Sequence, residues 1–343
     1  MSVIIASPAG GIALKTSRRR LLAGIFLCLA GLGIGIWTLA SGDYPLTFYE
    51  ILDVVRGGGD ETARMVVMEW RLPRFLAALA AGAMLGLAGA LFQSVFRNPL
   101  ASPDVMGFDA GAHFGAVVAM LVFGGGFFLV AGGALSGGAV AALAVYLFVA
   151  RGLSGFRLIV VGIGIGQLFF AASQWLLLQA GDEAAVAVAS WGLGSLNDMD
   201  KSRLAYLGIS AMLLVPPGLL LARSLRQLEL GDAIARGTGL DPGRTRLSAI
   251  LVGLALSALV TALVGPIGFI ALVAPQIARR LTADGDVALV HAALAGSTLL
   301  GASDLLAQKI PSGMPLPVGV VTLVLGGLWF FWLLLRSGRV GTS

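Results

Sequence analysis

Segments of about 20 consecutive apolar residues recur along almost the whole chain, which is the pattern of helices that cross a lipid bilayer. Charges, glycines and prolines separate ten such segments. The sequence predicts membrane-spanning helices at residues 21–40, 73–95, 104–123, 127–150, 157–180, 204–222, 247–265, 268–281, 287–307 and 316–335. Only 12% of the residues are charged, which excludes a water-soluble protein, where about 25% is typical. We therefore expect an all-α polytopic membrane protein.

The polar gaps are too short for a separate soluble domain. We expect a cytoplasmic tail over residues 1–20, one transmembrane domain over 21–336 and a second cytoplasmic tail over 337–343. With the N-terminus inside, the inner side holds 16 of the 23 lysines and arginines, at positions 15, 18, 19, 20, 97, 151, 157, 223, 226, 236, 244, 246, 279, 280, 336 and 339. This distribution agrees with ten crossings and with both termini in the cytoplasm.

Arg71 and Arg74 break the charge rule, because they lie at the expected outer mouth of the second segment, three residues apart on one helix face. They could reach toward lipid headgroups or pair with Glu69. They could instead form a cationic socket for acidic side chains of an extracytoplasmic partner, since a guanidinium suits carboxylates. Lys309, at the outer end of the ninth segment, could belong to the same rim.

Two prolines interrupt the chain after the second segment, in R-N-P-L-A-S-P-D at residues 97–104. A helix cannot continue through them, and the freed backbone groups must face protein or water. Such a polar break at membrane depth favours a cavity-lining hinge or gate. The alternative is an ordinary inner-face turn that Asp104 caps.

The longest expected inner loop, residues 223–246, contains a short helix that Asp232 could cap and that Gly237 and Gly239 end. It is either a solvated connector or a knob that inserts into a groove of another subunit, for which an ATPase is the natural partner. The chain has no G-x-x-x-x-G-K-[ST] phosphate-binding loop, so ATP hydrolysis would need a separate protein. One cysteine and two histidines without ligand spacing predict no metal site and give little support for an enzyme.

Five longer stretches of the sequence can be compared with the motifs of known protein families. They are W-R-L-P-R at 70–74, F-Q-S-V-F-R-N-P-L-A-S-P-D-V-M-G at 92–107, L-G-D-A-I-A-R-G-T-G-L at 230–240, G-P-I-G-F-I-A-L-V-A-P-Q-I-A-R-R at 265–280 and L-P-V-G-V-V-T-L-V-L-G-G at 316–327. Together, and in this order, they resemble the FecCD family, the iron–siderophore and vitamin B12 permease subunits of type II ABC importers. The resemblance implies a BtuC-like fold of ten helices in which helices 2–5 and 7–10 are inverted repeats.

The resemblance also implies roles for single residues. Arg71 and Arg74, with Lys309 as a candidate third cation, would receive the binding protein, and Asn98 and Leu100 would form the cytoplasmic gate. The helix that couples to the ATPase would contain Gly231, Asp232, Ala233, Ile234, Ala235, Arg236, Gly237 and Gly239. Candidates to line the pore are Gln167, Ser173 and Gln174 of the fifth segment.

Two positions depart from the family pattern. Gln308 stands where a third docking arginine is usual, which leaves Lys309 as its possible substitute. Gln276 stands where the family has a histidine in V-P-H, so a role that depends on that imidazole would not transfer.

The implied assembly contains a second permease chain, homologous but different, two copies of an ABC ATPase and an extracytoplasmic siderophore-binding protein, in the inner membrane of a bacterium. The ATPase would bind ATP and Mg²⁺, while this chain would bind no cofactor and no nucleic acid, and iron would be present only as chelated cargo. That cargo would be a ferric siderophore of the catecholate, enterobactin-like type. The alternatives are haem or cobalamin as cargo, or a secondary transporter coupled to an ion through Asp109 or Asp304.

Overall fold

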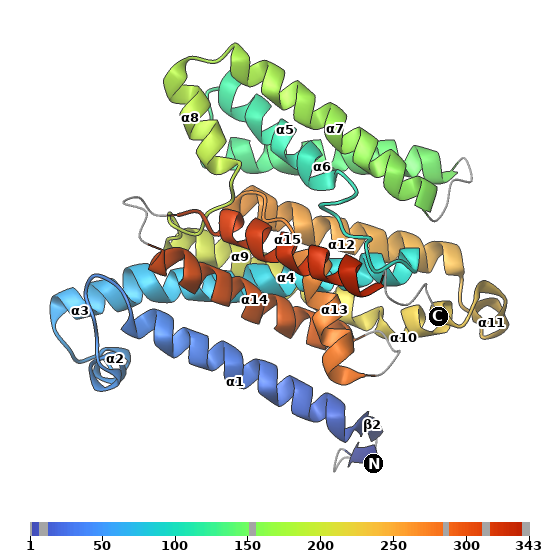
Figure 1. The fold of residues 1–343 in the computed structure, drawn as a ribbon, viewed down its shortest axis with the longest axis horizontal. Helices are drawn as coiled ribbons and strands as arrows, with labels where there is room; N and C mark the ends of the chain where they lie inside the picture. Colours follow the sequence, from blue (N-terminus) through green and yellow to red (C-terminus); the bar gives the residue numbers. More distant parts are fainter. Residues whose placement is uncertain (1, 7–12, 151–155, 284–287, 311–315, 338–343) are drawn as a thin grey trace.

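The computed structural model describes residues 2–6, 13–150, 156–283, 288–310 and 316–337 (Figure 1). A short antiparallel strand pair, β1 (Ser2–Ala6) and β2 (Ala13–Ser17), precedes the first helix. The helices are α1 (Arg18–Ala40), α2 (Phe48–Val55), α3 (Glu61–Met65), the π-helical turn η1 (Val66–Arg71), α4 (Leu72–Phe96), α5 (Phe108–Val122), α6 (Phe127–Ala150), α7 (Phe156–Leu178), α8 (Asp182–Trp191), α9 (Lys201–Leu220), α10 (Ala222–Glu229), α11 (Asp232–Gly237), α12 (Pro242–Val264), α13 (Ile270–Thr282), α14 (Leu289–Lys309) and α15 (Val318–Ser337).

The all-α membrane fold is confirmed. Seven helical segments within the described ranges are long and apolar enough to cross a bilayer, and α5 and α15 are shorter apolar helices. Together with α13, these helices occupy the ten positions that hydropathy predicted; they are α1, α4, α5, α6, α7, α9, α12, α13, α14 and α15. The number of crossings and their orientation stay predictions.

Helix α4 runs through the middle of the molecule, where α9, α12, α13 and α14 pack around it (Figure 1). In its most apolar stretch 78% of the residues are buried, whereas in that of α1, at the edge of the molecule, 22% are buried. A helix that is apolar on all sides suits this central position. Helices α5, α6 and α7 pack on one another as a second group, with α8 beside them.

Glycines bring α4 into backbone contact with its neighbours. A Cβ added to Gly86 would lie 2.2 Å from the carbonyl oxygen of Ala292 on α14, and one added to Gly89 would lie 1.7 Å from that of Ala271 on α13. No side chain fits at either position without moving backbone. These glycines give α4 a small-residue face for close helix packing.

We expect Gly89→Ala to destabilise the folded protein by about 1–3 kcal/mol or more, because the methyl group must push α13 away from α4. Thermal unfolding of the purified protein in detergent measures the change. Gly33→Ala is the matched control, since Gly33 lies on a helix and has no atom within 4 Å of its added Cβ. Equal melting temperatures for the two variants would contradict the packing argument.

Two short helices begin in the same unusual way. Helix α5 follows the non-helical residues 97–107, and α13 follows a break after α12. Their N-cap residues, Gly107 and Phe269, have left-handed backbones with φ of 81° and 69°. Helices α5 and α13 are the third and the eighth of the ten predicted segments, so one lies in each predicted repeat. A corresponding break in each repeat is what an inverted repeat predicts.

Helix α11 lies at one end of the molecule, where α1 begins, and α15 runs toward that end (Figure 1). Helices α2 and α3 lie at the opposite end. We call these the α11 end and the α2–α3 end. The expected gate and coupling residues belong to the first end, and the expected docking arginines belong to the second.

Candidate functional site

The segment between α4 and α5 is non-helical, as its two prolines predicted. Helix α4 ends at Phe96, and its C-cap residue Arg97 has a left-handed backbone with φ of 49°. The side-chain oxygen of Asn98 accepts a hydrogen bond of 2.9 Å from the backbone N–H of Leu100, which fixes a tight turn. Asn98 and Leu100 are both half-buried, so this turn presents part of their surface outside the helix packing.

Helix α13 holds this segment in place. The side-chain nitrogen of Gln276 donates to the carbonyl oxygens of Pro99 at 3.1 Å and of Leu272 at 3.2 Å. A carboxylate oxygen of Asp104 accepts from the backbone N–H of Phe269 at 2.9 Å. Asp104 therefore satisfies the start of α13 rather than capping its own turn, which corrects the alternative reading of this segment.

Helix α11 projects from the α11 end as a small exposed knob. Gly231 before it and Gly239 after it have φ of 118° and 82°, values that favour glycine. Ala233, Ile234, Arg236 and Gly237 are exposed, and Ala235 packs inward. The expectation that Asp232 caps the helix is wrong, since the N-cap residue is Gly231 and no side chain caps the first turn.

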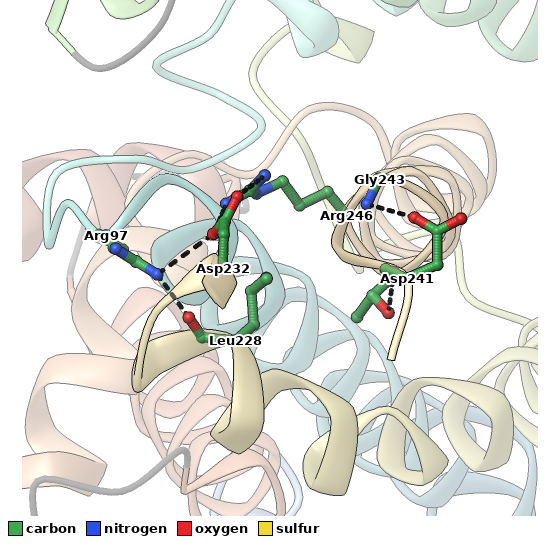
Figure 2. A network of polar contacts seen from close by, with 7 residues as sticks. Arg97, Leu228, Asp232, Asp241, Gly243 and Arg246 are labelled. Atoms are coloured by element: carbon green, nitrogen blue, oxygen red, sulfur yellow. Dashed lines mark hydrogen bonds and ion pairs between the residues drawn. The ribbon is translucent and has the colours of Figure 1, made fainter. Parts of the chain in front are cut away.

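Asp232 instead joins three elements in a polar network (Figure 2). Its carboxylate accepts hydrogen bonds from Nη2 and Nη1 of Arg246 on α12, at 2.6 and 3.1 Å. Nη2 of Arg97 lies 3.7 Å from the same carboxylate and also donates to the carbonyl oxygen of Leu228 on α10. The bonds from Arg246, with further attraction from Arg97 and Arg236, lower the pKa of Asp232, so its carboxylate is ionised at neutral pH. Asp232 thus connects α11 to Arg97, the residue directly before Asn98.

At the α2–α3 end, the two arginines contact their own chain. Nη1 and Nη2 of Arg71 donate to the carbonyl oxygens of Leu39 and Tyr44, each at 2.7 Å. Arg74 forms a two-pronged ion pair with Asp304 of α14, with Nε–Oδ2 and Nη2–Oδ1 distances of 2.9 and 2.8 Å. Although they are three residues apart on a helical turn, their side chains turn to different neighbours.

Other charged residues at this end behave differently from expectation. Glu69 pairs with Lys201 of α9 at 2.7 Å, so the alternative in which it pairs with Arg71 and Arg74 is wrong. Lys309 is exposed at the last position of α14, and Gln308 donates to Asp304 at 2.7 Å. Lys309 is thus the exposed member of the predicted docking set.

The three candidate pore residues on α7 separate into two groups. Gln167 and Gln174 are exposed on a helix face that otherwise carries large apolar side chains such as Leu168 and Trp175. Ser173 is fully buried and donates to the carbonyl oxygen of Phe169 in its own helix. Ser173 therefore faces the protein interior rather than an open surface, which corrects its assignment to the pore.

The model of the FecCD transport family matches residues 26–336, which is most of the chain. The chain belongs to the FecCD transport family. The ferric enterobactin transport system permease protein FepG of Escherichia coli (strain K12) is 44% identical over 324 residues, which cover 94% of this chain and 98% of that protein. The Fe(3+) dicitrate transport system permease protein FecD of the same strain is 34% identical, covering 91% of this chain and 98% of that protein.

A solved structure of an inward-facing ABC transporter of the metal-chelate type has the same fold. It is 26% identical and superposes with a TM-score of 0.79 over 92% of this chain and 99% of that chain. The FecCD permease described above is therefore a membrane subunit of an ABC importer, and the family expectation from its five sequence stretches is confirmed.

The structure shows which contacts the side chains make at the two departures from the family pattern. Gln276 uses its side-chain amide to hold the backbone of Pro99, next to the expected gate residues. Gln308 bonds to Asp304, which already holds Arg74. A neutral amide therefore occupies each of these positions in this FecCD permease, and each amide donates a hydrogen bond.

Arg97 is a site residue that sequence reasoning did not single out, as is Arg246. Both were counted only among the inner cations. For Arg97 the available signal was its position at the end of a long apolar helix, where a cation commonly binds the last carbonyl groups. Its partners, Asp232 and the carbonyl of Leu228, come from more than 130 positions farther along the chain.

Proposed function

We propose that this FecCD permease imports a ferric siderophore of the catecholate type, driven by separate ATPase subunits that dock on α11. One observation carries the proposal: the exposed helix α11 is joined through Asp232 to Arg97, directly before the predicted gate residues Asn98 and Leu100. A permease needs such a connection, because work done by an ATPase must reach the pathway. The 44% identity to a ferric enterobactin permease supports the choice of cargo.

The proposed orientation places the α11 end in the cytoplasm and the α2–α3 end outside. Two ATPase copies, with their ATP and Mg²⁺, would bind the inner surface, and a siderophore-binding protein would bind the outer rim that carries Lys309, Arg71 and Arg74. A second, homologous permease chain would complete the pathway. In this assembly the chain itself holds no cofactor and catalyses no reaction, and iron passes through it only as a chelate.

The exposed face of α7 supports a pathway between two permease chains. Polar groups on a membrane helix are unfavourable toward lipid, so Gln167 and Gln174 suit a water-filled passage or a facing subunit. Asp304 is engaged by Arg74, and Asp109 accepts a hydrogen bond of 2.8 Å from Ser257. These contacts occupy the two carboxylates that an ion-coupled secondary transporter would need.

Uptake into proteoliposomes tests this function. We expect ferric enterobactin to accumulate only when the second permease, the ATPase, ATP and the binding protein are all present. Uptake that continues without ATP would contradict the proposal and identify a secondary transporter. Haem or cobalamin that outcompetes ferric enterobactin would contradict the cargo while leaving the importer role intact.

A further inference from the structure

A cavity of about 680 Å³ opens near the α2–α3 end, where α8, the connection between α5 and α6, and the start of α9 meet. This volume lies within the range of small-molecule sites, about 300–1,000 Å³. Its wall combines aromatic rings, neutral polar groups and charges, from Phe127, Trp191, Ser195, Asn197, Asp198 and Arg203. A mixture of this kind can orient a ligand, which a purely apolar gap cannot do.

Arg203 is the cation on this wall. Its guanidinium carbon lies 5.4 Å from the centre of the Phe127 ring, and its side chain is half-buried. No carboxylate of the described residues lies within ion-pair distance of it, whereas Lys201 and Arg74 at the same end have Glu69 and Asp304. A partly desolvated guanidinium without a counter-ion attracts an anion, and its planar fork suits two adjacent oxygens.

The surrounding rings are held in fixed positions. Phe127 stacks on Tyr206 with ring centres 5.9 Å apart, and Trp191 stacks on His113 at 5.8 Å. Asp200 accepts from the backbone N–H of Arg203 at 2.7 Å, which fixes the start of α9. Rigid aromatic walls beside a cation favour a flat, anionic aromatic ligand. Asp198 carries the opposite charge but is exposed to solvent, which screens it.

We infer that this cavity is a binding site for an aryl-oxyanion ferric chelate, with Arg203 contacting the catecholate oxygens and Phe127 and Trp191 flanking the rings. The inference rests on the proposed function and deepens it, because it places a cargo contact within this one chain. The site receives the chelate at the α2–α3 end, before the chelate reaches the residues of the gate.

Direct binding of ⁵⁵Fe-labelled ferric enterobactin to the complete transporter in nanodiscs, without the binding protein, tests the site. We expect Arg203→Gln to weaken binding by about tenfold or more, as the loss of a charged hydrogen bond predicts. Arg203→Lys should give an intermediate loss, since it keeps the charge without the fork. Lys201→Gln is the matched control, because it removes the same charge two positions away, from an exposed pair, and should change binding less than twofold.

The ATPase rate and the melting temperature verify that each variant is folded. If Arg203→Gln does not fold, the binding measurement on Arg203→Lys decides the test. Unchanged affinity in the folded Arg203 variants, or an equal loss in Lys201→Gln, would overturn the site. The wild-type transporter could import ferric enterobactin and yet bind none of it when the binding protein is absent. That result would also overturn the site, and the proposed function would stand. Absence of ATP-driven uptake of any ferric chelate by the wild type would overturn the proposed function instead.

Discussion

Asp232→Asn is expected to leave ATP hydrolysis running while ferric enterobactin uptake falls by about fivefold or more, the lower end of a typical coupling free energy. The substitution keeps the shape of the side chain and removes the charge that Arg246 and Arg97 contact at 2.6 and 3.7 Å. Under the proposed function, α11 would still bind the ATPase, because its exposed Ile234 and Arg236 are unchanged. The contact through which α11 would act on Arg97 is then weakened (Figure 2), and with it the proposed connection to the turn that follows Arg97. The measurement is the number of ATP molecules hydrolysed per chelate imported into proteoliposomes.

A double-mutant cycle separates this coupling from a loss of stability. Arg97→Gln should give the same uncoupling, and adding Asp232→Asn to it should have little further effect, because both changes break one connection. Arg244→Gln is the control. Arg244 lies at the same end, is highly exposed and, among the residues that the structure describes, forms its ion pair with Asp241, three positions before it. A normal ratio of ATP to cargo in Asp232→Asn would show that α11 moves the gate by another route.

The helical framework could be predicted because hydropathy depends only on local composition, and each long apolar segment became a helix. The same method missed α2, α3 and α8. These helices have 8, 5 and 10 residues, too few to span a bilayer, and only part of each is apolar. Helix α2 shows a local signal of another kind, the capping box in which Thr47 and Glu50 bond reciprocally.

The polar contacts of the site could be predicted less well, because their partners lie far away in the sequence. Arg74 lies in the first turn of α4, but the residue it contacts is 230 positions distant and depends on how α14 packs along α4. Local pattern also favoured Asp232 as a helix cap. Two guanidinium groups compete for that carboxylate and offer stronger, charged bonds than a backbone N–H. Tertiary packing decided both outcomes.

Asp304→Asn is expected to destabilise the folded protein by about 3–5 kcal/mol, because it leaves Arg74 without its counter-ion in a partly buried position. The two side chains are 2% and 17% exposed, so solvent replaces little of the lost interaction. Thermal unfolding in detergent measures the loss. Lys201→Gln provides the contrast on the same rim, since the pair of Lys201 with Glu69 is 62% and 57% exposed and should contribute about 0–1 kcal/mol. Equal losses in the two variants would contradict the assigned role of Asp304.

The ion pair between Arg74 and Asp304 also determines how docking of the binding protein must be tested. Arg74→Glu would place two carboxylates together, so weaker docking in that variant could arise from unfolding alone. The exchanged variant, Arg74→Asp with Asp304→Arg, keeps an ion pair between α4 and α14 and should recover most of the stability. If docking needs the cation on α4 itself, the exchanged variant will be stable and still fail to bind. If docking recovers together with stability, Arg74 supports the rim from within, and exposed Lys309 is the residue to test next as the direct contact.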